Sequence, residues 1–177
     1  MAQATAIDNG VQWLKTSQNP DFSWGDPAAF ESTHVVNTAE VVNTLGLLNI
    51  KDTTYTNALN WLSSVVPDNN HTIARRLIAF GSSGGFSVDD LNAIVLSQNT
   101  AGGWGALAGV QSIVVDTVFN LLALKSANTS ALAYLLTTQN ADGGFGFYRG
   151  DVSNVYMTSL VSSTLQRFTQ TLSLIHI

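Results

Sequence analysis

The sequence predicts an all-α protein built from about four tandem helical hairpins. Three observations lead to this prediction. A loop phrase, Gln-Asn followed by an aromatic-Gly pair, occurs three times along the chain. Apolar residues on either side of the phrase recur at i, i+3, i+4 and i+7, which is the spacing of an amphipathic helix. Such hairpins cannot bury their apolar faces alone, so consecutive units must stack on one another.

The three copies of the phrase are recognised by their Gln and by the aromatic residue six positions later. They are Gln18 to Trp24, Gln98 to Trp104 and Gln139 to Phe145. The last two copies lie one repeat apart, whereas the first two lie about two repeats apart. The gap leaves room for a further hairpin that begins near Trp61 and lacks the phrase.

Each unit is therefore expected to be a helix, a loop and a second helix. We expect helices at 6–17, 33–48, 55–66, 71–81, 88–98, 110–126, 129–139 and 153–168. Asn128 provides an N-cap signal for the seventh of these helices. We assign residues 1–168 to one repeat domain. Residues 169–177 end in an apolar run without a cap, and we expect this tail to be non-native sequence outside the domain.

The residues of the phrase suit a structural role. A Gln at the end of a helix can donate to the last helical carbonyls, which have no partner within the helix. The Gly-Gly pairs at 102–103 and 143–144 can take positive φ where the chain reverses. The aromatic residue can then fold back and be buried between the helices. We expect the Gln and aromatic residues to hold the hairpins together.

Composition excludes several classes of function. Only 11% of the residues are charged, and the seven Lys and Arg form no basic stripe for nucleic acid. The only basic pair is Arg75-Arg76, which we expect on a solvated helix face. The chain has no Cys, which excludes disulfides, a thiolate zinc site and a Cys nucleophile.

No apolar run is long enough to span a membrane, and no signal peptide is visible in this stretch. Surface polarity comes mainly from Ser, Thr and Asn, a composition that favours an extracellular or cell-surface location.

Acidic and His residues give no clear metal site. Asp21, Asp142 and Asp151 lie in Gly-rich loops and could bind calcium, but neither loop alternates oxygen ligands up to a closing Glu. Turn formation is the preferred interpretation. His34 and His71 are isolated in the sequence, and we expect core or surface positions for them; His176 falls in the tail. We expect no metal and no cofactor.

Other short motifs also have a plain explanation. No Ser lies in a Gly-x-Ser-x-Gly elbow, and the Gly-rich segment 81–85 lacks the Lys of a phosphate-binding loop. The Arg149-Gly150-Asp151 tripeptide is expected to be a turn rather than an adhesion site.

The loop phrase resembles the QW motif of squalene and oxidosqualene cyclases, and more broadly the repeats of the terpenoid cyclase and protein prenyltransferase β-subunit superfamily. The matching residues are Gly10, Trp13, Leu14, Gln18 and Trp24; Ile94, Gln98, Gly102 and Trp104; and Ala131, Tyr134, Leu135, Gln139, Gly143 and Phe145. Phe22 replaces the Gly of the first copy, and Ala93 replaces an aromatic residue in the second.

The resemblance implies an α/α toroid, with two concentric layers of helices around a central cavity. A complete toroid has five or six hairpins. About four hairpins would form an incomplete ring, so we expect a fragment of a longer protein. The cavity would take an unidentified ligand, either an isoprenoid or a polar molecule.

The residues that would carry the family's chemistry are largely missing. Cyclases similar to this chain use an Asp-x-Asp-Asp acid, and only its last position survives here, as Asp116. An N-cap role is the alternative for Asp116. Asp89 and Asp90 are better explained as charges at a helix N-terminus. Without Cys, neither the prenyltransferase zinc site nor a thioester is possible.

Two function hypotheses follow. The first is a non-catalytic repeat module that binds or scaffolds within a larger protein. The second is a cyclase or prenyltransferase-type enzyme whose catalytic residues lie outside this stretch, with Asp116 as the candidate acid facing the cavity.

Overall fold

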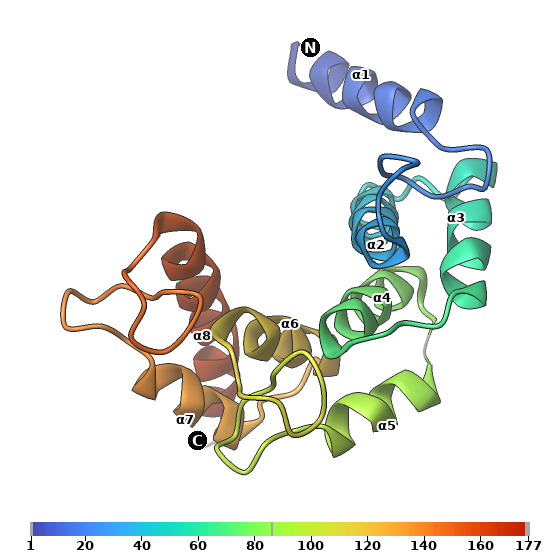
Figure 1. Cartoon of the computed structure of the whole chain (residues 1–177). Coiled ribbons are helices and arrows are strands. Elements are labelled where there is room, and N and C mark those ends of the chain that lie inside the picture. Colours follow the sequence, from blue (N-terminus) through green and yellow to red (C-terminus); the bar gives the residue numbers. More distant parts are fainter. Residues whose placement is uncertain (1, 86, 176–177) are drawn as a thin grey trace. The chain divides into compact units, whose positions relative to one another are not determined.

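A computed structural model describes residues 2–85 and 87–175, with side chains over 5–85 and 87–168. Within these residues the chain forms eight helices and no strand, which confirms the all-α prediction (Figure 1). The helices are α1 (Ala2–Thr16), α2 (Glu31–Leu47), α3 (Thr53–Ser64), α4 (Asn70–Ser83), α5 (Val88–Leu96), α6 (Val114–Leu124), α7 (Thr129–Thr137) and α8 (Val155–Ile175).

The start of α6 and the end of α8 differ from the expected boundaries. Helix α6 begins at Val114 rather than at residue 110, because the chain before it is still extended. Ile113 has φ −121° and ψ 153°, and its N–H donates to the Trp104 carbonyl at 2.9 Å. At the other end of the chain, α8 continues to Ile175, seven residues beyond the expected domain end; His176 lies outside the described residues.

Several helix starts show the caps that their sequences favour, with α3 and α7 as examples. The Asp52 carboxylate accepts a hydrogen bond from the Tyr55 N–H at 3.3 Å at the start of α3. Asn128 is the N-cap of α7, as predicted, and its side-chain oxygen accepts from the Ala131 N–H at 3.0 Å. Both caps satisfy a backbone N–H that has no partner within the helix.

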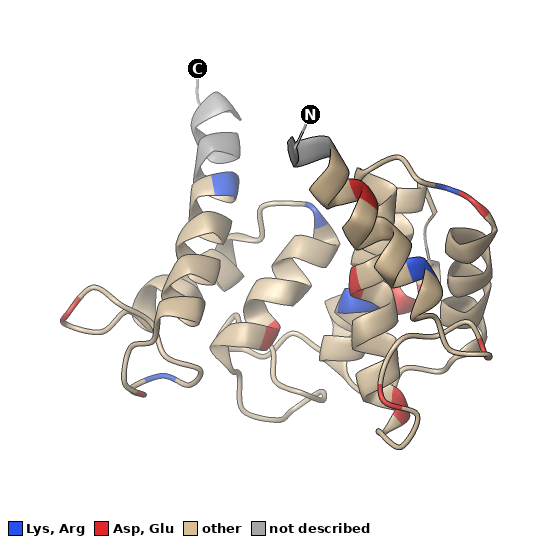
Figure 2. Ribbon diagram, turned by 90° about the horizontal axis from the view of Figure 1, so that it is seen from above, with Lys and Arg blue, Asp and Glu red and all other residues tan. Residues whose placement is uncertain are grey.

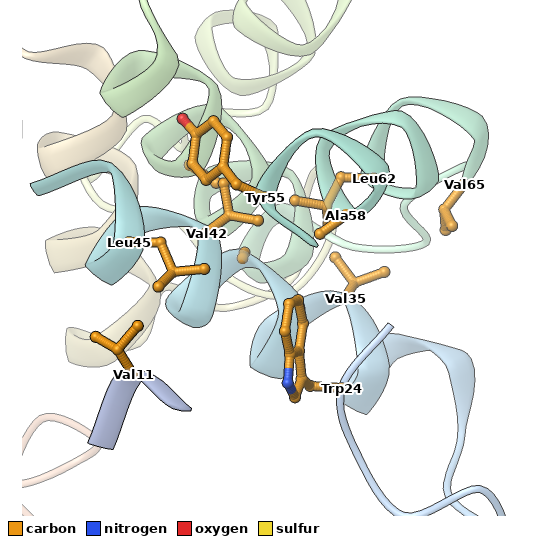
Figure 3. Packing of buried hydrophobic residues seen from close by; sticks show 11 residues of the cluster. Val11, Trp24, Val35, Val42, Leu45, Tyr55, Ala58, Leu62 and Val65 are labelled. Atoms are coloured by element: carbon orange, nitrogen blue, oxygen red, sulfur yellow. The ribbon is translucent and has the colours of Figure 1, made fainter. Parts of the chain in front are cut away.

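The chain divides into two compact units. Unit 1 comprises Met1–Asp68 and Arg75–Ser87, and unit 2 comprises Asn69–Ala74 and Val88–Ile177. In unit 1, α2 packs against α3, and their apolar faces meet at fully buried Val42, Leu45 and Leu62. The indole of Trp24 joins this cluster from the loop before α2 (Figure 3).

Unit 2 is organised around α6, which packs against both α7 and α8. Val118 and Leu121 of α6 are fully buried, as is Met157 of α8. Trp104 and Phe145, from the loops before α6 and α8, are buried in the same unit. The second helix of a hairpin is thus covered on several sides, which accounts for its continuous apolar sequence.

Charged residues are sparse along the ribbon (Figure 2). Arg75 pairs with Glu40 at 2.8 Å, and Arg76 is only 9% exposed. The Arg76 guanidinium donates to the carbonyls of Leu62 and Val65 at the end of α3. The expectation of a solvated basic pair was therefore wrong for Arg76, because its long side chain reaches helical carbonyls that lack an internal partner.

The length and apolarity needed to cross a bilayer are not reached by any helix among the described residues.

Candidate functional site

The three copies of the phrase form closely similar loops: loop 1 (residues 17–30), loop 2 (97–113) and loop 3 (138–154). Each begins with a tight turn in which the Asn main chain bonds twice to residues further along. The Asn99 N–H donates to the Gly103 carbonyl at 2.9 Å, and the Asn99 carbonyl accepts from the Gly102 N–H at 2.8 Å. The same pair of bonds occurs at Asn19 and at Asn140.

Positive φ is required at one position of this turn. Gly102 has φ +93° and Gly143 has φ +85°, and in loop 1 the equivalent residue is Phe22, with φ +74°. The second glycine of each pair has no positive φ. A Cβ on Gly144 would lie 2.5 Å from the Ser153 Cβ, so this glycine permits the returning chain to approach closely.

The Gln side chains bond to their own loops and not to the preceding helix, and Gln18 and Gln98 also bond to Thr54 and Asn128 at the start of the next hairpin. Gln18, Gln98 and Gln139 donate from Nε2 to the carbonyls of Phe22, Gly102 and Gly143, at 3.0, 2.6 and 2.9 Å. The last-turn carbonyls of Leu14 and Ile94 instead accept from the tryptophans, in addition to the N–H groups of Ser17 and Ser97.

Trp24 and Trp104 bond to the preceding helix through their indole Nε1. Trp24 Nε1 donates to the Leu14 carbonyl of α1, and Trp104 Nε1 donates to the Ile94 carbonyl of α5, both at 2.8 Å. Phe145 has no such donor, although it is buried to the same degree.

Sequence reasoning missed the residue that anchors the aromatic backbone. The main-chain N–H of each aromatic residue donates to the hydroxyl of a Thr in the following helix. The pairs are Trp24 with Thr38 at 2.9 Å, Trp104 with Thr117 at 3.0 Å and Phe145 with Thr158 at 2.9 Å. The signal was available, because a Thr recurs 14, 13 and 13 residues after the aromatic.

Loops also join successive hairpins. The Asn70 N–H at the start of α4 donates to the Ala106 carbonyl of loop 2 at 2.8 Å. The Val114 N–H at the start of α6 donates to the Phe147 carbonyl of loop 3 at 3.0 Å. The next loop along the chain thus supplies an acceptor at the start of α4, which Asn69 also caps, and at the start of α6, which has no side-chain cap.

Loop carboxylates serve the turns. Asp142 Oδ1 accepts from the Gly144 N–H at 2.9 Å and from the Ser153 hydroxyl at 2.8 Å, and these two hydrogen bonds hold its pKa below the usual range. Asp151 Oδ2 accepts from the Tyr148 N–H within the turn of the Arg-Gly-Asp tripeptide. Among the described residues no group of three His, Cys, Asp or Glu side chains is placed to hold a metal ion.

In loop 1 the carboxylate belongs to a longer network. Burial raises the pKa of Asp21, but hydrogen bonds from the Ser23 hydroxyl and N–H outweigh it and leave the pKa below its usual range. The Ser23 hydroxyl also lies 3.1 Å from Nδ1 of His34, whose Nε2 lies 2.7 Å from the Asp26 carbonyl. His34 is thus a buried residue with both ring nitrogens engaged.

Asp116 lies in the first turn of α6 but is not its N-cap, a position that Ile113 occupies without a side-chain bond. Asp116 is only 3% exposed. Its Oδ1 lies 3.2 Å from Nδ1 of His71. The His71 ring packs edge-on against Phe119, with centroids 5.0 Å apart. A carboxylate that orients an imidazole in this way is an arrangement able to move a proton.

One polar atom beside this pair has no partner. Asn120, one turn further along α6, donates from Nδ2 to the Asp116 carbonyl at 2.7 Å, while its buried Oδ1 has no partner among the described residues. Asp89 and Asp90 lie in the first turn of α5, as expected.

Compared with known proteins, the chain matches no protein-family model and no curated protein.

Proposed function

We propose that this chain is a helical-hairpin repeat module of the terpenoid cyclase and prenyltransferase type, which acts in binding or as a scaffold within a larger, exported protein. The observation that supports this most directly is the hydrogen-bonding pattern shared by the three loops. The phrase that resembles the QW motif is used for backbone bonds in each copy, so it supports architecture rather than chemistry. Four hairpins would form part of an α/α toroid.

Incubation of the protein with squalene and with prenyl diphosphates tests this proposal. A binding or scaffold module should give no product above a heat-killed control. Product formation would refute the proposal, as would an Asp-x-Asp-Asp sequence in further hairpins of the complete reading frame.

An enzyme is the second candidate, and the buried Asp116–His71 pair favours it. A carboxylate held against an imidazole, with an unpartnered amide oxygen one turn away, is more than packing requires. If the pair is catalytic, Asp116→Asn should abolish product formation while the far-UV circular dichroism stays unchanged. Equal activity in Asp116→Asn and the unmodified chain would remove Asp116 from any catalytic role.

A further inference from the structure

Loops 1 and 3 each contain a carboxylate that accepts two hydrogen bonds, and loop 2 does not. In loop 3, Asp142 accepts from the Gly144 N–H and from the Ser153 hydroxyl. In loop 1, Asp21 accepts from the N–H and the hydroxyl of Ser23, at 3.1 and 2.7 Å. The equivalent residue of loop 2 is Ala101, which has no polar side chain.

The donors, however, are retained in loop 2. Asn99 Nδ2 donates to the Ser112 hydroxyl at 2.9 Å, as Asn140 Nδ2 donates to the Ser153 hydroxyl at 2.9 Å. The main-chain bonds that place Gly103 match those that place Gly144. The two donors that hold Asp142 in loop 3 therefore have counterparts in loop 2, namely the Ser112 hydroxyl and the Gly103 N–H.

Neither counterpart donates to an acceptor among the residues that the structure describes. Ser112 is 8% exposed, and its oxygen accepts from Asn99 while its hydrogen has no acceptor there. Gly103 is buried, and its N–H likewise donates to no acceptor among the described residues. A buried donor left without an acceptor is costly, by about 1–3 kcal/mol on average, so an acceptor from outside the chain would be favoured.

Ala101 and Ser112 line a groove of about 390 Å³ in unit 2. Arg149 also lines it. It forms no ion pair among the described residues. On the same wall, Tyr134 donates its hydroxyl to the Ser112 carbonyl at 2.8 Å. Burial raises the pKa of Tyr134, and the nearby Arg149 charge opposes that rise. The guanidinium thus contributes positive charge to the groove that Ser112 lines, whereas loops 1 and 3 have an internal negative charge.

We propose that this groove binds a carboxylate, whose oxygen takes the place of the Asp142 carboxylate and accepts from Ser112 and Gly103 while Arg149 supplies the positive charge. The inference rests on the proposed binding function and specifies its ligand class. Two charge-assisted hydrogen bonds beside a guanidinium favour an ionised acceptor over a neutral one.

The proposal is tested by titrating the ¹⁵N-labelled chain with sodium acetate and recording amide chemical shifts at constant ionic strength. Saturable shifts are expected at Gly103 and Ser112. Neutral acetamide, at the same concentrations, should produce none. A blocked aspartate, N-acetyl-Asp-N-methylamide, distinguishes a peptide side chain from a free small carboxylate: tighter binding than acetate identifies a peptide as the source.

Two variants make the result specific. Ala101→Asp supplies the missing carboxylate internally, and Arg149→Gln removes an exposed charge without disturbing the core. Each should weaken acetate binding by about tenfold or more, equivalent to one strong interaction. Ala101→Ser, similar in size to alanine and uncharged, is the matched control and should retain binding.

The outcomes are decisive in either direction. A saturable acetate response that is lost in Ala101→Asp and Arg149→Gln supports the proposal. No saturable response, an equal response to acetamide, or full affinity in Arg149→Gln overturns it. Should Ala101→Asp fail to fold, Arg149→Gln and acetamide still decide the question. Failure here leaves the broader binding function to be judged separately, by the squalene and prenyl diphosphate incubation.

Discussion

The Thr hydroxyl that anchors each aromatic residue allows a quantitative test of the loop architecture. Thr117 Oγ1 accepts from the Trp104 N–H at 3.0 Å and donates to the Ile113 carbonyl at 2.8 Å, and both Thr117 and Trp104 are fully buried. Thr117→Val preserves the shape of the side chain and removes the hydroxyl. The Ile113 carbonyl keeps the Thr117 main-chain N–H as a donor at 3.1 Å, so it is not orphaned.

The main loss in Thr117→Val is therefore the acceptor of one buried N–H. Such a group left unsatisfied costs about 1–3 kcal/mol, and we expect the free energy of unfolding to fall by that amount. Thr117→Ser keeps the hydroxyl and loses one methyl group, at a cost of about 1 kcal/mol. Thr158→Val should have a smaller effect than Thr117→Val, because Thr158 is only half-buried.

Urea denaturation followed by circular dichroism and tryptophan fluorescence measures these differences. The comparison requires that the m value, the slope of the free energy of unfolding against urea concentration, is the same for all variants. A Thr117→Val protein within about 0.5 kcal/mol of the unmodified chain would refute the anchoring role. A larger loss in Thr158→Val than in Thr117→Val would contradict the assignment of the cost to burial.

Three further predictions concern single residues. Phe22→Gly should raise the free energy of unfolding by up to about 1 kcal/mol, because a φ of +74° strains a residue with a Cβ, whereas Phe22→Ala should give no gain; thermal unfolding compares the two. Arg76→Met should lower the free energy of unfolding by about 2–3 kcal/mol in urea denaturation, because the buried carbonyls of Leu62 and Val65 lose a charged donor. The lowered pKa of Asp142 means that its stabilisation is present above about pH 4 and is lost as the pH falls through the folded pKa, so Asp142→Ala should flatten the acid side of a plot of stability against pH.

The sequence was sufficient for the features that depend on neighbouring residues. The helices and the Gly-rich turns follow from apolar spacing and from residues a few positions apart, such as Asn99 and Gly102. The N-cap at Asn128 was predictable for the same reason.

Pairings between distant residues could not be read in this way. His71 and Asp116 are 45 positions apart, and each is unremarkable in its own segment. Arg76 was expected in solvent because a charged residue beside another charged residue usually lies there, yet its side chain crosses to the end of α3. Such contacts are set by how helices pack, which the local pattern does not contain.

Comparison among the repeats separates what the loop architecture requires from what it does not. The residue before the anchoring Thr is Asp116 in α6 but Met157 in α8, and Met157 is fully buried there. The repeat therefore tolerates an apolar residue where it holds an ionisable one in α6, so the fold alone does not demand the Asp116 carboxylate.

At Ala101 the comparison shows the opposite case, in which a neighbouring repeat has a carboxylate and this repeat lacks it. Loop 3 shows that the turn accommodates a carboxylate, and loop 2 retains the two donors without it. A repeat that keeps its donors but lacks their acceptor differs from its neighbours in binding capacity rather than in backbone geometry. In this chain the departures from the repeat, not the residues that define it, are therefore the places where function is to be sought.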